Sequence, residues 1–212
     1  MILEQIMTRD VATLTPSDSI KTALQLMRDR KIRHIPLINE EMQLIGLVTD
    51  RDIKIATPIL IEADLLNEII DMPLSTVMTK NIITGHPLDF VEEITVIFYD
   101  HKIGCLPIVS GGKLVGIITS TDLLHTMVEL TGANKPGSQI EIKVENKPGS
   151  LYEVTAVFHK HYINIHSVLV YPDPTDPNYT ILVFRVATIN PLNLIKNLIK
   201  EGLNVLWPGM TP

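Results

Sequence analysis

The apolar positions in the first part of the chain form the same pattern twice. Within residues 20–27, apolar side chains recur at the i, i+3, i+4, i+7 spacing of one helical face, and residues 91–98 repeat that face. The short apolar runs "HIPLI" and "QLIGLVT", joined by the polar "NEEM", follow the first of these segments and predict two strands connected by a turn. We therefore expect each copy to form a strand, a helix, two further strands and a short helix.

The repetition extends to individual residues. Three segments of the first copy return in the second: "IMTRDVATLTPSDSI" as "VMTKNIITGHPLDFV", "RHIPLI" as "GCLPIV", and "LIGLVTDRDI" as "LVGIITSTDL". The offset is 71 residues between Met7 and Met78 and 70 between Gly46 and Gly116, so the second copy is one residue shorter between two of its strands. A unit of this length gains stability by packing against its twin, and the interface between two such units favours a small-molecule site.

The rest of the chain consists of a connecting segment and a domain with a different pattern. Leucines and isoleucines within 65–70 predict an inserted helix that ends before Pro73. The stretch "ELTGANKPGSQ" at 129–139 contains two glycines and a proline and indicates a domain boundary. The pattern after it predicts the order β-α-β-β-α-β of a ferredoxin-like sandwich. We expect an α/β (α+β) protein with domains at 1–66, 67–134 and 138–212.

Two predicted strands of the third domain indicate a homodimer. "INIHSVLVY" and "YTILVFRVA" are apolar at nearly every position, which is typical of strands buried on both faces. The two helices of one chain cover only one face of such a sheet, so a second subunit is the expected cover, with the repeated half of the same chain as the alternative. Ile165 and Val168 are expected to point to opposite faces, because side chains alternate along a strand.

Composition and charge limit the classes of function. The chain has 212 residues, of which 20% are charged, and a net charge of −6. This balance argues against nucleic-acid binding, which needs clustered Lys and Arg. No apolar run approaches the roughly 18 residues of a membrane span, and the N-terminus lacks the basic start and long apolar run of a signal peptide. We expect a cytoplasmic, soluble protein that binds neither nucleic acid nor membrane.

Sequence motifs for catalysis and metal binding are absent. The sequence contains no G-x-S-x-G, P-loop, H-E-x-x-H or Cys–His signature. His159 and His161 lie near a predicted helix end without an accompanying Cys or carboxylate motif, so we interpret them as surface residues. The single cysteine, Cys105, excludes an intrachain disulfide. We expect no catalytic residue, no metal and no enzyme cofactor.

Two kinds of segment carry a resemblance to known families. "LVTDRD" and "IITSTD", each following a glycine and an apolar strand, resemble the corresponding segments of a tandem pair of CBS domains, a Bateman module. "VENKPGSLYEVTAVFHKHYINIHSV" resembles part of an ACT domain, and the order CBS–CBS–ACT is similar to that of acetoin utilization proteins over essentially the whole chain. The resemblance implies a non-catalytic regulatory protein, linked to acetoin catabolism, that binds AMP, ADP, ATP or S-adenosylmethionine between the repeats.

The same resemblance implies which residues bind the nucleotide. Thr49 and Asp52, like their equivalents Thr119 and Asp122, lie where a strand ends and a helix starts. A carboxylate there can accept two hydrogen bonds from ribose hydroxyls, while the threonine and the N–H groups of a helix start suit a phosphate. The other implied contacts, which would offer backbone groups and apolar walls to an adenine, are Ala12, Thr13, Arg33, His34, Ile35, Pro36, Ile83, Thr84, Cys105, Leu106 and Pro107, and Lys102 is included as a cation.

These positions also have plain structural interpretations. A T-x-x-D sequence at a helix start is a capping motif, and Arg51 and Lys54 can belong to a solvated helix face. His34 can be a packed core histidine, and Cys105 can be an inert small hydrophobe. The presence of the Thr–Asp pair in both copies favours binding over capping alone.

The two copies differ in charge. Arg33–His34 becomes Gly104–Cys105, and Asp50–Arg51 becomes Ser120–Thr121. The first copy therefore offers more cationic side chains to a polyphosphate. We expect its site to prefer ATP or ADP, unless the cleft draws cations such as Lys102 from the opposite copy.

The turn "NKPGSL" carries the candidate site of the third domain. The resemblance implies that Asn146, Gly149, Ser150 and Leu151 bind an amino acid or another small effector at a subunit interface. A plain strand-to-helix turn capped by Ser150 is the alternative. We interpret the chain as a ligand sensor that regulates a protein the sequence does not identify. The alternative is a partner-binding or assembly protein whose CBS sites are vestigial.

Overall fold

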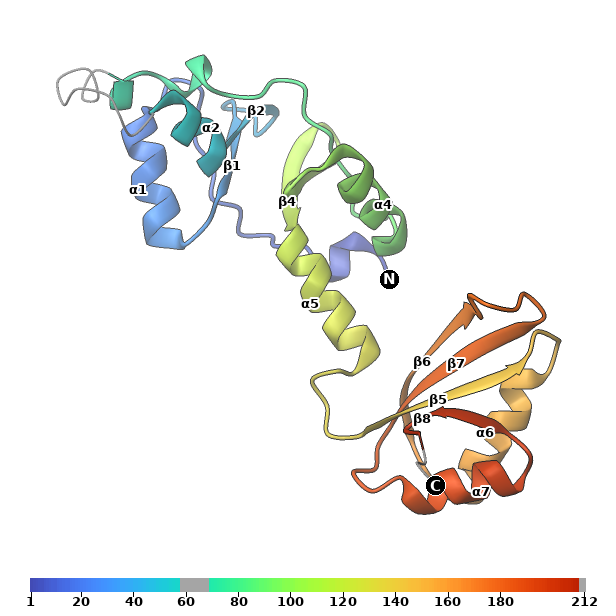
Figure 1. The fold of residues 1–212 in the computed structure, drawn as a ribbon. Helices are drawn as coiled ribbons and strands as arrows, with labels where there is room; N and C mark the ends of the chain where they lie inside the picture. Colours follow the sequence, from blue (N-terminus) through green and yellow to red (C-terminus); the bar gives the residue numbers. More distant parts are fainter. Residues whose placement is uncertain (58–68, 210–212) are drawn as a thin grey trace. The chain divides into compact units, whose positions relative to one another are not determined.

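The computed structural model describes residues 1–57 and 69–209, and the chain divides into two compact units, Met1–Leu124 and His125–Pro212 (Figure 1). The helix predicted at 65–70 lies largely outside the described residues. Its last two positions, 69–70, are described and are helical. No helix within the described ranges is long and apolar enough to cross a membrane.

The first unit contains the two copies, each built around a two-stranded antiparallel sheet. In the first copy, a 3-10 helix η1 (Leu3–Gln5) precedes α1 (Ile20–Arg30), β1 (His34–Ile38), β2 (Leu44–Thr49) and α2 (Asp50–Ala56). In the second, η2 (Leu74–Thr76) precedes α4 (Val91–His101), β3 (Cys105–Ser110), β4 (Lys113–Thr119) and the start of α5 (Ser120–Thr131), which continues into the second unit from His125 on. The two sheets have equivalent registers, with Pro36 opposite Leu47 and Pro107 opposite Ile117.

The strand predicted at the start of each copy is reduced to a single bridge. In the first copy Leu14 pairs in parallel with Leu37, and the second copy has the equivalent bridge. The pairing ends because the next backbone N–H, that of Thr15, donates to Oδ2 of Asp18 at 2.7 Å instead of joining the ladder. A side chain in the following turn thus stops the strand.

Each copy has a hydrophobic core that a segment from outside the copy completes. The predicted helical faces are buried in these cores, through Ile20, Ala23 and Met27 of α1 and Val91, Ile94 and Phe98 of α4. Leu3 and Met7, at the start of the first copy, pack into the core of the second, whereas Leu74 and Met78, near the start of the second copy, pack into or against the core of the first. The backbone hydrogen bonds that fix this exchange join Thr8 to Ile117 at 3.0 Å and Thr79 to Leu47 at 2.9 Å, in both directions.

A glycine in each central strand makes room for the exchanged methionine. A Cβ atom on Gly46 would lie 2.7 Å from Sδ of Met78, and one on Gly116 would lie 2.6 Å from Sδ of Met7. The repeated glycine therefore has a packing role, because only a residue without a side chain lets the methionine sulfur lie this close to the strand.

The second unit is a four-stranded antiparallel sheet with two helices packed on one face (Figure 1). Its elements are β5 (Ser138–Glu145), α6 (Ser150–Lys160), β6 (Ile165–Pro172), β7 (Tyr179–Val186), α7 (Leu192–Lys200) and β8 (Asn204–Trp207), in the sheet order β6-β7-β5-β8. This is the predicted order of a ferredoxin-like sandwich. In the core between helices and sheet, Phe158 and Phe184 meet edge to face, with 4.7 Å between ring centroids.

The edge strand of this sheet differs from the prediction. The centre of β7 is buried on both faces, but the last four residues of β6 are exposed. A β-bulge at His166 shifts the register, so Ile165 and Val168 both pack against the core, and the prediction that they point to opposite faces is wrong. The next residue, Leu169, pairs with Val183 on the face away from the helices.

Candidate functional site

Both Thr–Asp pairs form a capping box where a strand passes into a helix. The backbone N–H and the hydroxyl of Thr49 donate to Oδ2 of Asp52 at 2.8 and 2.7 Å, and the Asp52 N–H donates back to the hydroxyl at 3.2 Å. Thr119 and Asp122 repeat these contacts at 2.7, 2.7 and 3.4 Å. The capping interpretation is therefore correct in both copies. The capping role does not exclude ligand binding, because the capping box uses Oδ2 of Asp52 and Oδ1 lies outside the box.

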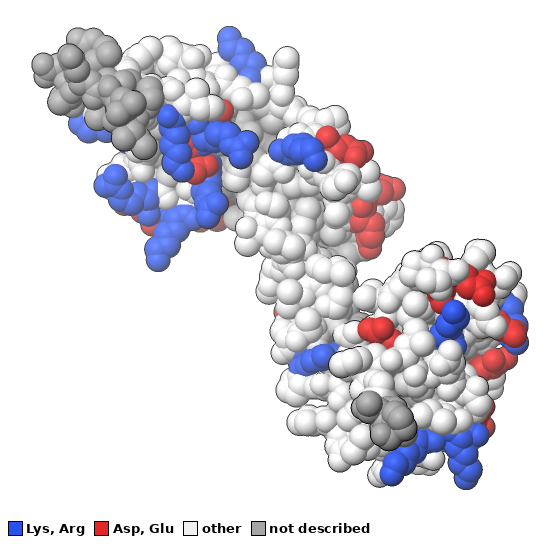
Figure 2. Space-filling model, in the orientation of Figure 1, with Lys and Arg blue, Asp and Glu red and all other residues white. Residues whose placement is uncertain are grey.

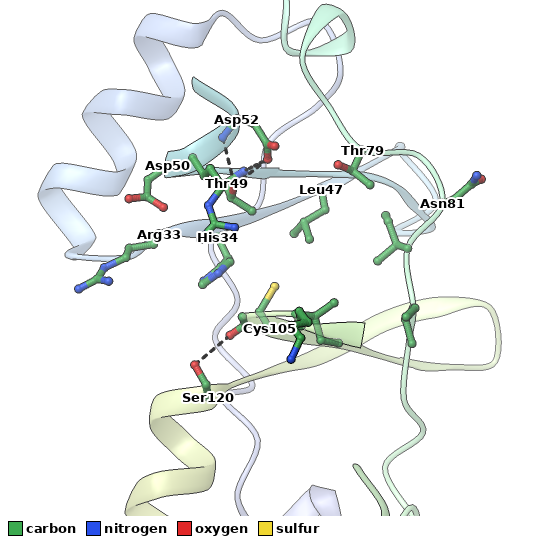
Figure 3. Close-up of a pocket in the computed structure, with 16 residues that line it drawn as sticks. Arg33, His34, Leu47, Thr49, Asp50, Asp52, Thr79, Asn81, Cys105 and Ser120 are labelled. Atoms are coloured by element: carbon green, nitrogen blue, oxygen red, sulfur yellow. Dashed lines mark hydrogen bonds between the residues drawn. The ribbon is translucent and has the colours of Figure 1, made fainter. Parts of the chain in front are cut away.

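The first Thr–Asp pair lines a pocket of about 480 Å³, a volume typical of small-molecule sites (Figure 3). Thr49 and Asp52 come from the first copy, whereas much of the remaining wall comes from the second copy, within 79–83 and 102–105. Arg33 and His34 border the pocket where β1 begins. Figure 3 shows His34 pointing from β1 toward the strand that carries Cys105.

The second pair lines a pocket of about 520 Å³ with the reciprocal composition. Thr119 and Asp122 come from the second copy, and the opposing wall comes from the first copy, within 8–12 and 30–34. Each pocket is therefore composite, because neither copy alone supplies both the carboxylate and the wall that faces it.

The structure places the residues implied by the resemblance in three groups. Ten of them line one or both pockets: Ala12, Arg33, His34, Thr49, Asp52, Ile83, Lys102, Cys105, Thr119 and Asp122. Two, Thr13 and Thr84, lie next to a lining residue but outside both linings. The other four, Ile35, Pro36, Leu106 and Pro107, are buried beneath the pockets, because only the residues at the very start of β1 and β3 reach the cleft.

Sequence reasoning missed several lining residues, of which Arg30 and Lys31 matter most for charge. A signal for Lys31 was present, since it is the repeat equivalent of Lys102. Both lysines follow a helix in the left-handed conformation, with φ of 54° and 55°. This shared turn brings a lysine to the mouth of each pocket.

The two pockets carry equal numbers of charged side chains. The first is lined by Arg33, Arg51 and Lys102 together with Asp50 and Asp52, and the second by Arg30, Lys31 and Arg33 together with Asp10 and Asp122. The expectation of a more cationic first site is therefore not supported, because the second pocket takes its cations from the first copy. On the face drawn in Figure 2, basic side chains gather over α1 and α2 and acidic ones over α4.

Burial and local charges set the protonation of two lining residues. Burial lowers the pKa of His34, and the neighbouring carboxylate of Asp50 opposes this effect. Burial raises the pKa of Cys105 to about 12, so its thiol stays protonated at neutral pH. The interpretation of Cys105 as an inert small hydrophobe agrees with this environment.

The turn before α6 is held by hydrogen bonds within the second unit. Gly149 is the N-cap, with φ of 96°, and Ser150 is the first helical residue. The interpretation of Ser150 as the cap is therefore wrong; its buried hydroxyl instead donates to the carbonyl oxygen of Glu145 at 2.7 Å. Leu151 is 43% exposed, and the backbone N–H of Asn146 donates to Asn178 O at 2.8 Å. Effector binding at this turn stays a prediction.

Metal ligands do not gather anywhere in the described part of the chain. Within residues 1–57 and 69–209, no group of three or more His, Cys, Asp or Glu side chains could hold an ion.

Family models match nearly the whole chain. The model of the CBS domain matches residues 3–57 and 74–129, which together make up just over half of the sequence. The model of the ACT domain matches residues 138–202.

Relatives of known name match the chain over somewhat more than half of its length. A homoserine O-acetyltransferase from Methanococcus vannielii is 34% identical over 127 residues, which cover 59% of this chain and 25% of that protein. The CBS domain-containing protein YhcV from Bacillus subtilis is 33% identical over 121 residues, covering 57% of this chain and 81% of that protein. The chain thus spans about a quarter of the length of the first relative.

Two solved structures extend the comparison. One, described as an acetoin utilization protein (AcuB) from Vibrio cholerae, has a TM-score of 0.55 and 30% identity, and the match covers 64% of this chain and 97% of that one. The other is the CBS domain pair of protein MJ0100 in complex with 5′-methylthioadenosine and S-adenosyl-L-methionine. Its TM-score is 0.53 at 25% identity, covering 64% of this chain and 98% of that one.

Proposed function

Because the chain belongs to the CBS-domain family and carries a CBS pair followed by an ACT domain, we propose that it is a regulatory sensor that binds an adenosine derivative in the CBS pair. The observation that carries this proposal is the pair of pockets, each combining a carboxylate held in a capping box with three cationic side chains. The MJ0100 structure supports the ligand class, because a CBS pair 25% identical to this chain was solved with two adenosine derivatives.

The pocket chemistry suits a nucleoside that carries phosphates. Thr49 fixes one oxygen of Asp52, so the other oxygen is oriented before a ribose hydroxyl arrives. Hydrogen bonds to a charged acceptor contribute about 1.5–3 kcal/mol. Arg33, Arg51 and Lys102 line the same pocket and supply the positive charge that phosphate oxygens need. AMP, ADP and ATP are the candidate ligands that carry phosphates, whereas S-adenosylmethionine carries none and is a candidate because of the MJ0100 complex.

Titration calorimetry on the full chain tests the proposal. We expect at least one of the four adenosine ligands to bind, and the matching guanosine nucleotides serve as controls for the purine. If none of the four binds at millimolar concentration, the alternative of an assembly protein with vestigial CBS sites is correct.

A regulatory role, without catalysis, also accounts for the matches to enzymes. The homoserine O-acetyltransferase shares only a quarter of its length with this chain, so most of that enzyme lies outside the shared region. The likeness to the Vibrio cholerae protein, at 30% identity, supports a setting in acetoin catabolism. Deleting the gene should then impair growth on acetoin and leave growth on glucose unchanged.

The ACT domain is proposed to pair two chains through the sheet face that its helices leave uncovered. Leu169, Tyr171 and Trp207 are 41%, 40% and 56% exposed, and their strand partners Val183, Ile181 and Glu141 also lie on that face. A second copy would cover the exposed side chains of Leu169, Tyr171 and Trp207. In sedimentation equilibrium at tens of micromolar we expect a dimer, and Leu169→Asp should produce monomers.

A matched control separates this face from the rest of the domain. Ile199→Asp changes an aliphatic residue of similar exposure, 44%, on α7 and should leave the dimer intact. A wild-type chain that sediments as a monomer contradicts the proposed dimer.

A further inference from the structure

The two pockets share part of their walls. Arg33, His34, Gly104 and Ser120 line both of them, and we call these four residues the shared wall. Two ligands bound at the same time would each lie against this wall. Binding in one pocket can therefore affect the other without any movement of the chain.

The shared wall is asymmetric, although the repeat would allow it to be symmetric. Arg33 and His34 correspond to Gly104 and Cys105 in the second copy. The absence of a side chain at Gly104 gives the imidazole its space, because a Cβ atom there would lie 2.8 Å from Nε2 of His34. One arginine and one histidine thus line both pockets.

The other cations each belong to a single pocket. Arg51 and Lys102 line only the first pocket, whereas Arg30 and Lys31 line only the second. An anion in either pocket can therefore bind the cations that line only that pocket, whether or not the other pocket is occupied. Arg33 is different, because donors that are engaged by an anion in one pocket are not free for an anion in the other.

We infer that the two pockets are negatively coupled through Arg33 for ligands that carry phosphates, and are independent for uncharged adenosine. This inference rests on the proposed function, since it concerns how the same two sites are regulated. Its physical basis is that one guanidinium cannot make its full set of hydrogen bonds to anions in both pockets at the same time. A coupling of about tenfold is the ordinary size for such linkage.

Coupling can be measured by comparing the intact chain with two variants that each retain one pocket. Asp122→Asn retains the first pocket and Asp52→Asn retains the second, and an amide preserves an acceptor for the capping box. The wild type has two stepwise association constants, and each variant has one. If the pockets are independent, the product of the two wild-type constants equals the product of the two variant constants. With ADP as the probe, calorimetry should give a wild-type product at least about tenfold lower than the product from the two variants. We call this ratio the ADP deficit. Adenosine should give equal products.

Two arginine variants identify the residue responsible. In an Arg33→Gln background the ADP deficit should fall to within about twofold, because both pockets lose the shared cation. In an Arg51→Gln background the affinity of the first pocket for ADP should fall while the ADP deficit remains, because Arg51 lines only that pocket. Circular dichroism confirms that each variant is folded.

The outcomes separate this inference from the proposed function. Lack of binding by all four adenosine ligands contradicts the proposed function itself, whereas lack of binding by ADP alone contradicts only the coupling. Binding of ADP to both pockets without a deficit, or a deficit that survives Arg33→Gln, contradicts the coupling and leaves the proposed function intact.

Discussion

Asp52 is expected to have two roles, in helix capping and in ligand binding, and substitutions can separate them. Its Oδ2 accepts both hydrogen bonds of the Thr49 capping box, at 2.8 and 2.7 Å, whereas Oδ1 lies outside the box. Asp52→Ala removes both roles. Asp52→Asn keeps a neutral acceptor for the cap and loses the negative charge that strengthens hydrogen bonds from ribose hydroxyls.

The magnitudes follow from these contacts. Loss of the cap in Asp52→Ala should lower the free energy of unfolding by about 0.5–2 kcal/mol, and Asp52→Asn should lower it by less. Loss of the charged acceptor should weaken binding in the first pocket by about 1.5–3 kcal/mol in both variants. That energy corresponds to roughly a tenfold to hundredfold increase in Kd.

Urea unfolding and titration calorimetry on the same preparations provide the two measurements. Asp18 supplies a matched control, because it accepts from the backbone N–H and hydroxyl of Thr15, at 2.7 and 2.9 Å, outside both pockets. Asp18→Asn should affect stability like Asp52→Asn and leave binding unchanged. If Asp52→Asn binds every ligand as tightly as the wild type, its carboxylate makes no ligand contact and the reasoning is refuted.

Three further predictions concern stability and reactivity. Leu74→Ala should lower the free energy of unfolding by about 2–5 kcal/mol, because Leu74 is fully buried in the core of the first copy, and a urea-unfolding loss below about 1 kcal/mol would contradict that packing. Hydrogen bonds from Lys143 and Thr175 hold the pKa of Asp173 below its usual value of 3.8, so its stabilising effect is complete above pH 4 and is lost as the pH falls further. Thermal melts of Asp173→Asn should therefore vary less with pH below 4 than those of the wild type, and an equal variation would count against the ion pair. Because burial raises the pKa of Cys105 to about 12, a thiol reagent at pH 8 should label the native protein at least about 100-fold more slowly than the unfolded one, and equal rates would show that the thiol is accessible.

The repeat explains how much of the site could be predicted from sequence. The repeat, with an offset of 70 residues at this point, predicts two equivalent Thr–Asp pairs, and the structure shows the same capping box in both. Its earlier offset of 71 residues relates Lys31 to Lys102, so applying the repeat to every position would also have found Lys31. Features that follow local periodicity, such as the buried faces of α1 and α4, were predictable for the same reason.

Features that depend on distant contacts could not be predicted from local patterns. The bulge at His166 interrupts a run of apolar residues without any change in polarity, so alternation alone misplaced Val168 relative to Ile165. The composite origin of each pocket arises from how the copies pack, which no window of sequence records. The number of cations in the second pocket was underestimated for that reason, because Arg30 belongs to the first copy.

The exchanged segments have a consequence for biosynthesis. When the ribosome has completed the first copy, Leu74 has not yet left it, so the core of that copy lacks one of its fully buried side chains. Leu3 is among the first residues made, but its packing partners in α4 are synthesised almost ninety residues later. The core of the first copy is therefore complete only when the chain has been made as far as Met78, whereas the core of the second copy combines the first residues made with residues up to Leu123. The first copy should gain protease resistance only after the start of the second copy has left the ribosome, and the second copy should follow it.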